Sequence, residues 1–303
     1  MRSLLLAASR NATLNRLASS YGLRFGAARF VAGETLGDFV PVVRKLGADG
    51  FVVASTILGE GVQSAAQTKE VVDEYRTLLE RIATERLPAN VALKLTHLGL
   101  AIDEELAAGN VRTLVDEAAR LGNFIRIDME ESVYVDATLR IYRGLRESGR
   151  DNVGTVLQAY LYRTPSDLAA LQPLRPNLRL VKGAYLEPAS IAHPKKTDVD
   201  RAYKALIDQA LSGAGYTAVA THDEDAIAHA IAFASARGFP PRGRFEFQQL
   251  YGVRPALQKR LASEGYVVRI ATPFGRSWYP FFMRRLAERP ANVAFILSSL
   301  WKG

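Results

Sequence analysis

The sequence contains no cysteine, and this absence excludes disulfide bonds, thiolate metal sites and a cysteine nucleophile. No apolar run approaches the ~18 residues that a membrane-spanning helix needs. The two common phosphate-binding loops are also missing: residues 59–64 (GEGVQS) lack the third glycine of the dinucleotide pattern, and Gly-Lys followed by Ser or Thr occurs nowhere. What remains is a chain of 303 residues with an ordinary globular composition, 48% hydrophobic and 23% charged.

Acidic residues are missing from the first 33 positions, which hold five arginines. This pattern resembles a transit peptide or a basic surface helix that contacts anionic lipid, and it is equally typical of a solvated helix packed on the domain. The net charge of +8 suits acidic small molecules or anionic membranes. Nucleic acid is not an expected partner, because no Lys/Arg cluster carries interleaved aromatics. We expect a cytoplasmic protein that can contact the inner face of the plasma membrane peripherally.

From residue 50 onward, short β-branched runs alternate with longer amphipathic ones. The predicted strands are 51–56, 90–97, 124–131, 152–161, 178–185, 216–222, 244–250 and 266–273. A predicted helix follows each, for example 68–85, 110–122, 202–213 and 277–290, with glycines such as Gly109, Gly122 and Gly149 expected at helix ends. Eight such units in roughly 240 residues predict a (β/α)8 barrel, although an open doubly wound sheet remains possible because counting cannot show closure. We expect an N-terminal helical segment over 1–49, the barrel over 50–290 and a closing helix over 291–303.

Polar residues interrupt the predicted strands, although the strands of a barrel are covered on both faces. In 124–131, the period of two places Arg126, Asp128 and Glu130 on the face that we expect to point inward. The other polar strand residues are Lys94, Gln158, Arg179, Lys182, Glu246, Gln248 and Arg269. Interior ion pairs, such as Lys94 with Asp128, would explain single members of this set. A purely structural layer this polar is disfavoured, since burying one unpaired charge costs several kcal/mol.

Three kinds of chemistry could use these residues. A Schiff base could form on Lys182 or Lys94, as in class I aldolases. An organic cofactor could bind with Arg179 near an electron-rich ring and the backbone around Gly183 near its phosphates. A hard cation could be held by carboxylates and a histidine, although their spacing is not diagnostic. Those metal candidates are Asp128, Glu130, His222 and Glu246.

Residues 281–288 (FFMRRLAE) place two arginines side by side in a helical pattern. One interpretation is a solvated helix face with an ion pair between Arg284 and Glu288. The other is a pair of guanidinium groups that binds a carboxylate. Adjacent residues lie about 100° apart on a helix, so both arginines can reach one carboxylate only if this helix lies over the open end of the barrel.

Seven motifs occur in the order and spacing of the proline dehydrogenase family, and together they resemble its monofunctional bacterial form. They are LKLTHLG, IDMEES, VLQAYLYRT, RLVKGAYLEP, ATHDE, FEFQQLYGVR and FFMRRLAERPAN, between residues 90 and 296. The resemblance implies a distorted (β/α)8 barrel that holds FAD, oxidises L-proline to Δ1-pyrroline-5-carboxylate and passes the electrons to a membrane quinone. By family analogy, a pyrroline-5-carboxylate dehydrogenase is an expected partner.

The resemblance also implies roles for single residues. Catalytic roles are implied for Asp128, which organises the site, and for Arg179, beside the reactive flavin nitrogen. Substrate binding is implied for Lys94, Tyr185, Arg284 and Arg285. Cofactor binding is implied for Met129, Gln158, Arg179, Lys182, Gly183, Ala184, Thr221, His222, Gln248 and Glu288, and no metal is implied. Two departures stand out: Ala271 replaces a tyrosine that usually packs over the proline ring, and Leu186 replaces a tryptophan of fused relatives.

Two rival classes stay open at this point. One is a metal- or Schiff-base-dependent barrel lyase or aldolase that acts on a small carboxylic acid. The other is a barrel that binds an amino acid as a sensor. A flavin spectrum that bleaches with L-proline would exclude both.

Overall fold

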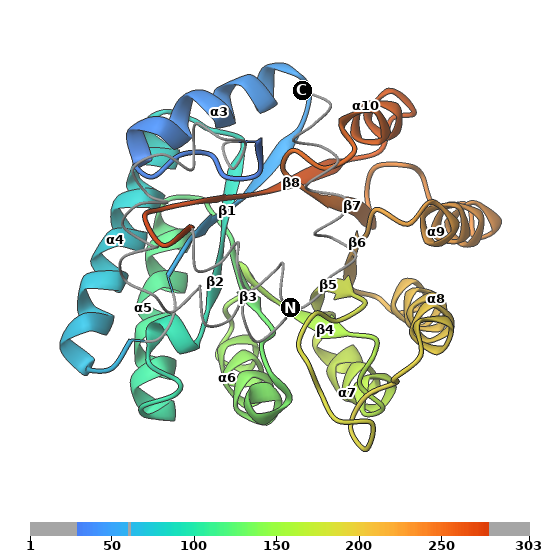
Figure 1. The fold of residues 1–303 in the computed structure, drawn as a ribbon, viewed down its shortest axis with the longest axis horizontal. Coiled ribbons are helices and arrows are strands. Elements are labelled where there is room, and N and C mark those ends of the chain that lie inside the picture. The colour runs from blue at the N-terminus through green and yellow to red at the C-terminus, as the bar shows by residue number, and fades with distance from the viewer. Residues whose placement is uncertain (1–28, 60–61, 279–303) are drawn as a thin grey trace, which may run out of the picture.

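The computed structural model describes residues 29–59 and 62–278, in which eight parallel strands close into a barrel (Figure 1). The strands are β1 (Val52–Ile57), β2 (Ala89–Lys94), β3 (Ile125–Asp128), β4 (Val153–Gln158), β5 (Asn177–Val181), β6 (Tyr216–Ala220), β7 (Phe245–Leu250) and β8 (Val268–Phe274). Each strand pairs with the next, and closure comes from β1 pairing with β8, for example Val53 with Ile270. The predicted (β/α)8 barrel is confirmed, and the open-sheet alternative is wrong.

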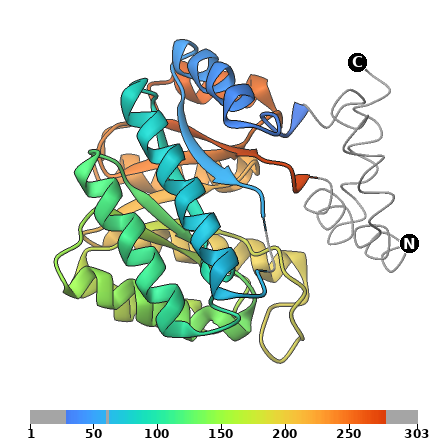
Figure 2. The ribbon, with the colours of Figure 1, turned by 90° about the vertical axis from the view of Figure 1, so that its left-hand side faces the viewer.

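Helices lie along the outside of the barrel, as the side view in Figure 2 shows. In chain order they are α3 (Leu36–Ala48), α4 (Ala65–Thr84), α5 (Glu104–Arg120), α6 (Val135–Glu147), α7 (Thr164–Leu171), α8 (Lys196–Ser212), α9 (Glu224–Ala236) and α10 (Pro255–Ser263). Within the described ranges, no helix has both the length and the apolar character needed to cross a bilayer. The predicted helix 277–290 lies outside the described residues beyond Trp278, as does the closing helix 291–303.

Local signals explain where the helices begin and end. Thr35 and Asp38 form a capping box at the start of α3, in which each side chain accepts a hydrogen bond from the other's backbone N–H. Gly122 and Gly149 follow α5 and α6 with φ of +65° and +83°, as expected of C-terminal glycines. The expectation for Gly109 is wrong, because Asp103 caps α5 upstream and leaves Gly109 inside the helix.

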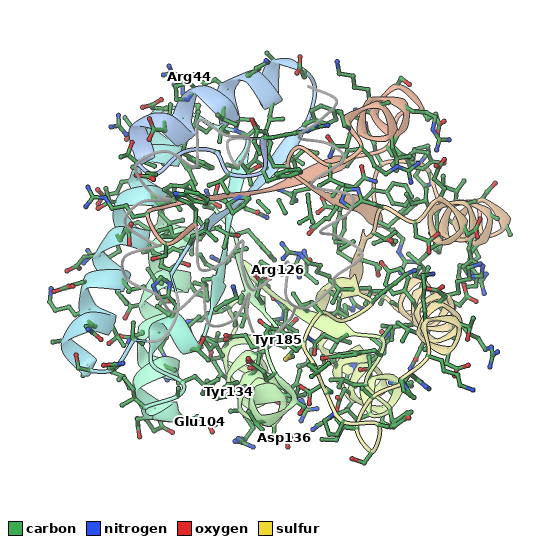
Figure 3. The ribbon with its side chains drawn as sticks, in the orientation of Figure 1. Arg44, Glu104, Arg126, Tyr134, Asp136 and Tyr185 are labelled. Carbon is green, nitrogen blue, oxygen red and sulfur yellow. The ribbon has the colours of Figure 1, made fainter. Side chains whose placement is uncertain are left out.

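The strands separate an apolar outer layer from a polar interior. Ile125 and Ile127 of β3 are fully buried in the core between barrel and helices. Arg126 comes between them in the sequence and, in Figure 3, lies within the barrel. Its burial is nearly complete, at 2% exposed, as is that of Glu246 on β7. The predicted inward face of β3 is therefore observed for Arg126, and the interior of the barrel contains charge.

Several strands end earlier than predicted, at the carboxyl end of the barrel. Strand β3 ends at Asp128, β4 at Gln158 and β5 at Val181, so that the MEE and KGAY segments are loops. Polar side chains of these loops contact neighbouring loops: the Glu130 side chain, for example, accepts a hydrogen bond from the backbone N–H of Thr96. These loops surround the end of the barrel at which (β/α)8 enzymes bind their substrates, and we call this end the mouth.

Candidate active site

The predicted site residues that the structure describes all lie in or just after strands β2 to β7, toward the mouth. They are Lys94 on β2, Asp128 and Met129 at β3, Gln158 on β4, Arg179, Lys182, Gly183, Ala184 and Tyr185 at β5, Thr221 and His222 after β6, and Gln248 on β7. Arg284, Arg285 and Glu288 lie outside the described residues. The fold thus brings together positions that are up to 154 residues apart in the chain, from Lys94 to Gln248.

Arg179 is held on two sides by side chains from other strands. Its Nη1 donates to Asp128 Oδ1 at 2.6 Å, and its Nε donates to Gln248 Oε1 at 2.5 Å. The Arg179 side chain is 11% exposed and that of Asp128 21%. A guanidinium group has five N–H donors. Among the described residues Nη2 of Arg179 has no hydrogen-bond partner, so this fixed cation keeps donors for a ligand.

A second ion pair lies next to this arrangement inside the barrel. Glu246 accepts from Arg269, with Nε to Oε1 at 2.7 Å and Nη2 to Oε2 at 3.1 Å. Tyr216 donates to Glu246 Oε2 at 3.1 Å, and Gln248 Nε2 donates to Oε1 at 2.5 Å. Burial alone would raise the pKa of Glu246, but the positive charge and hydrogen bonds of Arg269 outweigh it and lower that pKa below its usual range.

Arg126 is a buried cation whose hydrogen bonds go to neutral groups. Its Nη1 donates to the carbonyl oxygens of Thr155 and Asn177, and its Nη2 donates to the Asn177 side chain. Burial and, next, the charge of Arg179 lower the pKa of Arg126 to about 9. The barrel interior thus contains the guanidinium groups of Arg126, Arg179 and Arg269 against the carboxylates of Asp128 and Glu246. This surplus of positive charge favours an anionic ligand at the mouth.

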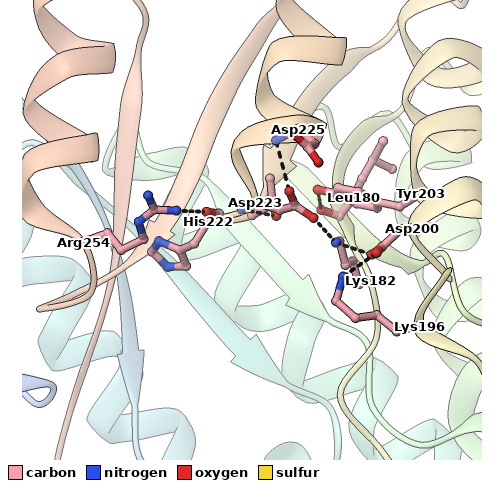
Figure 4. A network of polar contacts seen from close by, with 10 residues as sticks. Leu180, Lys182, Lys196, Asp200, Tyr203, His222, Asp223, Asp225 and Arg254 are labelled. Carbon is pink, nitrogen blue, oxygen red and sulfur yellow. Dashed lines mark hydrogen bonds and ion pairs between the residues drawn. The ribbon is translucent and has the colours of Figure 1, made fainter. Parts of the chain in front are cut away.

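Lys182 sits in a network of carboxylates shown in Figure 4. Its Nζ lies 2.5 Å from an oxygen of Asp200 on α8 and 2.5 Å from one of Asp223, the N-cap residue of α9. Neither aspartate was among the predicted site residues. The acid-rich start of a helix in ATHDE could have indicated Asp223 as a cap, whereas no sequence signal indicated Asp200. The side chain of Lys182 is therefore occupied by protein groups.

His222 and Gln158 near the mouth each have a buried polar atom without a partner among the described residues. His222 Nε2 accepts from the backbone N–H of Leu250 at 3.0 Å, which places the proton of the neutral ring on Nδ1. Burial, with the charge of Arg254, lowers the pKa of His222 to about 4, so the ring is neutral at pH 7. Its Nδ1 and the Oε1 of Gln158 are buried without a partner in the described structure. Such atoms are rare in folded proteins and indicate groups that meet a ligand or water.

Gly183 turns the chain sharply after β5. Its φ is +114°, and a Cβ added there would lie 2.2 Å from Cδ1 of Tyr160. Glu187, further along the same loop, accepts hydrogen bonds from Ser132, at 2.7 Å from its backbone N–H and 2.6 Å from its hydroxyl. This contact fixes the loop that carries Tyr185 to Ser132, in the connection that follows β3. The sequence did not reveal it.

Glu130 provides a pH-dependent prediction. Its buried carboxylate accepts from the N–H of Thr96 at 3.0 Å and from the Thr96 hydroxyl at 2.5 Å, yet burial raises its pKa to about 7. The folded state then binds more protons than the unfolded state between pH 4.5 and 7, so stability falls as pH rises through this window. We expect Glu130→Gln, which lacks this titration, to exceed the wild type in unfolding free energy at pH 8 by up to about 3 kcal/mol.

Urea unfolding of both proteins at pH 5 and pH 8 measures this difference. The advantage of Glu130→Gln should shrink toward pH 5, where the wild-type carboxyl is protonated in the folded state. A difference between the two proteins that is the same at both pH values would contradict the assignment.

The candidate metal ligands do not form one site. Asp128 is bonded to Arg179, Glu246 to Arg269 and His222 to a backbone N–H. Across residues 29–59 and 62–278, no group of three His, Asp or Glu side chains is placed to hold a metal ion. A Schiff base on Lys182 is also disfavoured, because its Nζ lies between two carboxylates. These contacts thus remove support from a metal-dependent lyase and from a Schiff base on Lys182. They do not address a Schiff base on Lys94.

A parallel eight-stranded barrel with charged side chains gathered at the carboxyl ends of its strands defines an enzyme of the (β/α)8 class. A family model described as proline dehydrogenase matches residues 39–297. The chain belongs to the proline dehydrogenase family, and it is therefore an oxidoreductase.

Individual relatives agree with this membership. Proline dehydrogenase 1 of Bacillus subtilis (strain 168) is 42% identical over 302 residues, which are 100% of this chain and 99% of the relative. Proline dehydrogenase of Deinococcus radiodurans is 45% identical over 281 residues, 91% of this chain and 90% of the relative. The crystal structure of proline utilization A from Bdellovibrio bacteriovorus, inactivated by N-propargylglycine, shares the fold with a TM-score of 0.82 at 22% identity, over 94% of this chain and 36% of that one. The family resemblance predicted from the motifs is confirmed.

Proposed function

We propose that this protein oxidises L-proline to Δ1-pyrroline-5-carboxylate with bound FAD and passes the electrons to a quinone. The observation that carries the proposal is Arg179, fixed by Asp128 and Gln248 at the mouth of a barrel of this family, with donors left over. A fixed cation of this kind suits a reaction in which negative charge builds up on an acceptor.

The residues at the mouth fit a flavin. Within residues 29–59 and 62–278, Gln158 offers a buried acceptor and His222 a buried donor without partners, and Arg179 keeps N–H groups that bond to no protein atom. Gly183 lets the backbone after β5 approach a ligand closely, since it carries no side chain. Bound FAD would supply the acceptor for two electrons from the substrate. For Lys182 the support is weaker, since Asp200 and Asp223 already hold its ammonium group.

The protein's own residues would bind and orient the amino acid. Oxidation to the cyclic imine removes a proton from nitrogen and a hydride from the adjacent ring carbon that does not carry the carboxylate. The carboxylate itself is unchanged. Lys94 ends β2 opposite Asp128 in the strand register, and this position at the mouth supports a role for its ammonium group in binding that carboxylate. Arg179 would stabilise the charge that the hydride brings to the acceptor, and Asp128 would hold its guanidinium in place.

The carboxylate proposal extends to Arg284 and Arg285. We expect Arg284→Met or Arg285→Met to raise the KM for L-proline at least about tenfold, because each removes a charge-assisted hydrogen bond to the carboxylate. Steady-state kinetics, together with the flavin-to-protein absorbance ratio, measures this effect, and the ratio should stay near the wild-type value. Arg260→Met, which removes an exposed arginine paired with Glu224, is the matched control. An unchanged KM in both variants would remove these arginines from the substrate site.

The absorption spectrum tests the proposed function itself. Purified protein should show a flavin spectrum that bleaches on anaerobic addition of L-proline. A colourless protein that is inhibited by a chelator, or trapped on a lysine by borohydride, would favour the lyase or aldolase. A flavin that L-proline does not reduce would favour the sensor.

An apolar rim around the mouth supports a lipid-soluble acceptor and peripheral membrane contact. In the described part of the chain, the exposed large hydrophobic side chains all lie at a strand's carboxyl end or in the connection between a strand and the α-helix that follows it: Ile102, Val133, Tyr162, Leu186, Ile191 and Leu250. Such a surface suits the headgroup region of a bilayer, from which a quinone can reach the mouth.

Vesicle binding tests the apolar rim. Val133 is 77% exposed and Leu186 69% exposed. Because little of either side chain is buried in the protein, we expect Val133→Ser with Leu186→Ser to weaken binding to anionic phospholipid vesicles about tenfold at unchanged thermal stability. Flotation or sedimentation with vesicles measures the change. Equal binding by the variant and the wild type would separate this rim from the membrane.

The imine product suggests a partner. Relatives such as the bifunctional protein PutA of Escherichia coli (strain K12) match 95% of this chain with only 26% of their own length, at 26% identity. We propose that the reactive product passes to a pyrroline-5-carboxylate dehydrogenase. This partner is proposed by analogy with those fused proteins.

A further inference from the structure

The polar contacts of Arg179 continue into the barrel beyond the site. Gln248 follows Glu246 by two residues on β7, so both side chains face the interior. The chain of hydrogen bonds runs from Asp128 through Arg179, Gln248 and Glu246 to Arg269 on β8. Arg269 in turn donates from Nη1 to the carbonyl oxygen of Val53 on β1 at 3.2 Å. The contacts thus link β3, β5, β7, β8 and β1 across the interior.

The Gln248 amide is the part of this chain that has two possible orientations. An amide presents an acceptor at one end and two donors at the other, and a half-turn exchanges them. Arg179 Nε needs the oxygen, because an N–H facing an N–H would repel it. The carboxylate of Glu246 accepts only, so it requires the NH2 end of Gln248 at 2.5 Å. Glu246 therefore selects the orientation in which the Gln248 oxygen faces Arg179.

Arg269 holds Glu246 in the state that this selection requires. Glu246 is 2% exposed, and a carboxylate so deeply buried is stable only when it is paired and hydrogen-bonded. The contact with Arg269 uses both carboxylate oxygens, which also fixes the plane of the group. A protonated Glu246 could donate to the Gln248 oxygen and reverse the amide.

We propose that Glu246, held by Arg269, is a positioning residue for Arg179, and that it acts through the Gln248 amide without contacting substrate or cofactor. The proposal rests on the proposed function, because it takes the Arg179 guanidinium to lie beside a bound flavin. It adds two residues, one on β7 and one on β8, to those on which the reaction depends.

The sign of one measurable quantity separates positioning from plain electrostatics. Glu246→Gln removes a negative charge from the barrel, so a purely electrostatic effect would make reduction of the bound flavin more favourable. If Glu246 positions Arg179, the freed Gln248 amide can turn, Arg179 loses its place and reduction becomes less favourable. The double variant Glu246→Gln with Arg269→Met removes one charge of each sign, so electrostatics alone predicts little change. Positioning again predicts less favourable reduction.

The experiment measures the midpoint potential of the bound flavin in the wild type, Glu246→Gln and the double variant. We expect the two-electron reduction equilibrium to become about tenfold less favourable in both variants, equivalent to a potential about 30 mV lower. The rate constant for flavin reduction by L-proline should fall about tenfold, while the KM for L-proline changes less than threefold. The double variant removes both partners of the Glu246–Arg269 ion pair, so neither partner is left as a buried charge without the other, and the test stays available if Glu246→Gln alone does not fold.

Glu130→Gln is the matched control, because it neutralises another buried carboxylate that is bonded to Thr96 and not to Gln248. It should leave the potential unchanged or raise it. A raised potential in Glu246→Gln together with an unchanged one in the double variant would overturn the positioning role. If the wild type itself binds no flavin, the proposed function fails instead, so the two failures have different signatures.

Discussion

Replacing Arg179 with methionine is expected to slow the reduction of bound flavin by L-proline about 10²–10³-fold, the usual cost of losing a fixed donor to developing negative charge. Methionine keeps much of the length and packing of the side chain but removes the charge and every N–H donor. The KM for L-proline should change less, within about threefold, because the carboxylate is assigned to other cations. Rapid mixing under anaerobic conditions, with the flavin absorbance as the signal, measures reduction and binding separately.

The surroundings of Arg179 explain why the effect should fall on the chemical step. Asp128 and Gln248 fix its guanidinium before any ligand arrives, so little reorganisation is needed during the reaction. Arg140→Met on α6, which breaks an exposed contact with Glu104, is a matched control that should leave both constants unchanged. Weaker proline binding with a normal reduction rate in Arg179→Met would instead assign Arg179 to the substrate.

Replacing Gly183 with alanine is expected to abolish flavin binding and to destabilise the fold by about 3 kcal/mol or more. The added Cβ would lie 2.2 Å from Cδ1 and 2.5 Å from Cγ of Tyr160, whose buried ring has little room to move. The φ of +114° adds backbone strain, because side-chain-bearing residues rarely adopt it. Relief of the clash would shift the loop that follows β5, where the cofactor contacts are proposed.

Gly122→Ala separates strain from collision. Gly122 also has a positive φ, of +65°, but nothing lies within 4 Å of its added Cβ. We expect a cost of about 1 kcal/mol for this variant and a normal flavin content. Urea unfolding and the flavin-to-protein absorbance ratio measure both variants. Equal losses of stability and full flavin content in the two would show that the approach to Tyr160 is unimportant.

The periodicity of the sequence predicts the alternating strands and helices because it follows from burial. Strands covered on both faces must be rich in β-branched residues, and the period of two in 124–131 correctly places Arg126 inside the barrel. Closure could not be counted, since it depends on β1 reaching β8 across more than 200 residues of sequence, as in the register of Val53 with Ile270. The boundaries of α5 were missed because Asp103 caps it ahead of Gly109.

The sequence predicted which polar side chains lie near one another better than it predicted which of them form ion pairs. The period of two in the strands and the family resemblance predicted that Asp128, Arg179 and Gln248 lie close together, and the structure brings their side chains into contact. Which cationic side chain forms an ion pair with which carboxylate depends on the shape of the closed barrel. Arg179 reaches Asp128 across the intervening β4, although Lys94 is the register partner of Asp128 on the adjacent strand. The partners of Lys182 were likewise invisible, since Asp200 comes from a helix face that only the tertiary fold brings near.

The surplus of positive charge in the interior relates fold to substrate. Arg126 is hydrogen-bonded to neutral groups only, and Glu246, the carboxylate that attracts it, is already paired with Arg269. The carboxylate of an amino-acid substrate and a cofactor that gains negative charge would both be stabilised by this surplus, whereas a ligand with a net positive charge would be disfavoured. Ala271 on β8 does not alter this electrostatic argument, because its effect would be on the packing around the ring of the substrate.

A crystal structure with FAD and an unreactive analogue of proline, in which oxygen replaces the ring nitrogen, is the most direct measurement of the central claim. The account predicts the isoalloxazine ring within hydrogen-bond distance of Arg179, and the carboxylate of the analogue within about 3.2 Å of Lys94 Nζ. A flavin bound elsewhere on the barrel, or a carboxylate directed away from Lys94, would contradict it.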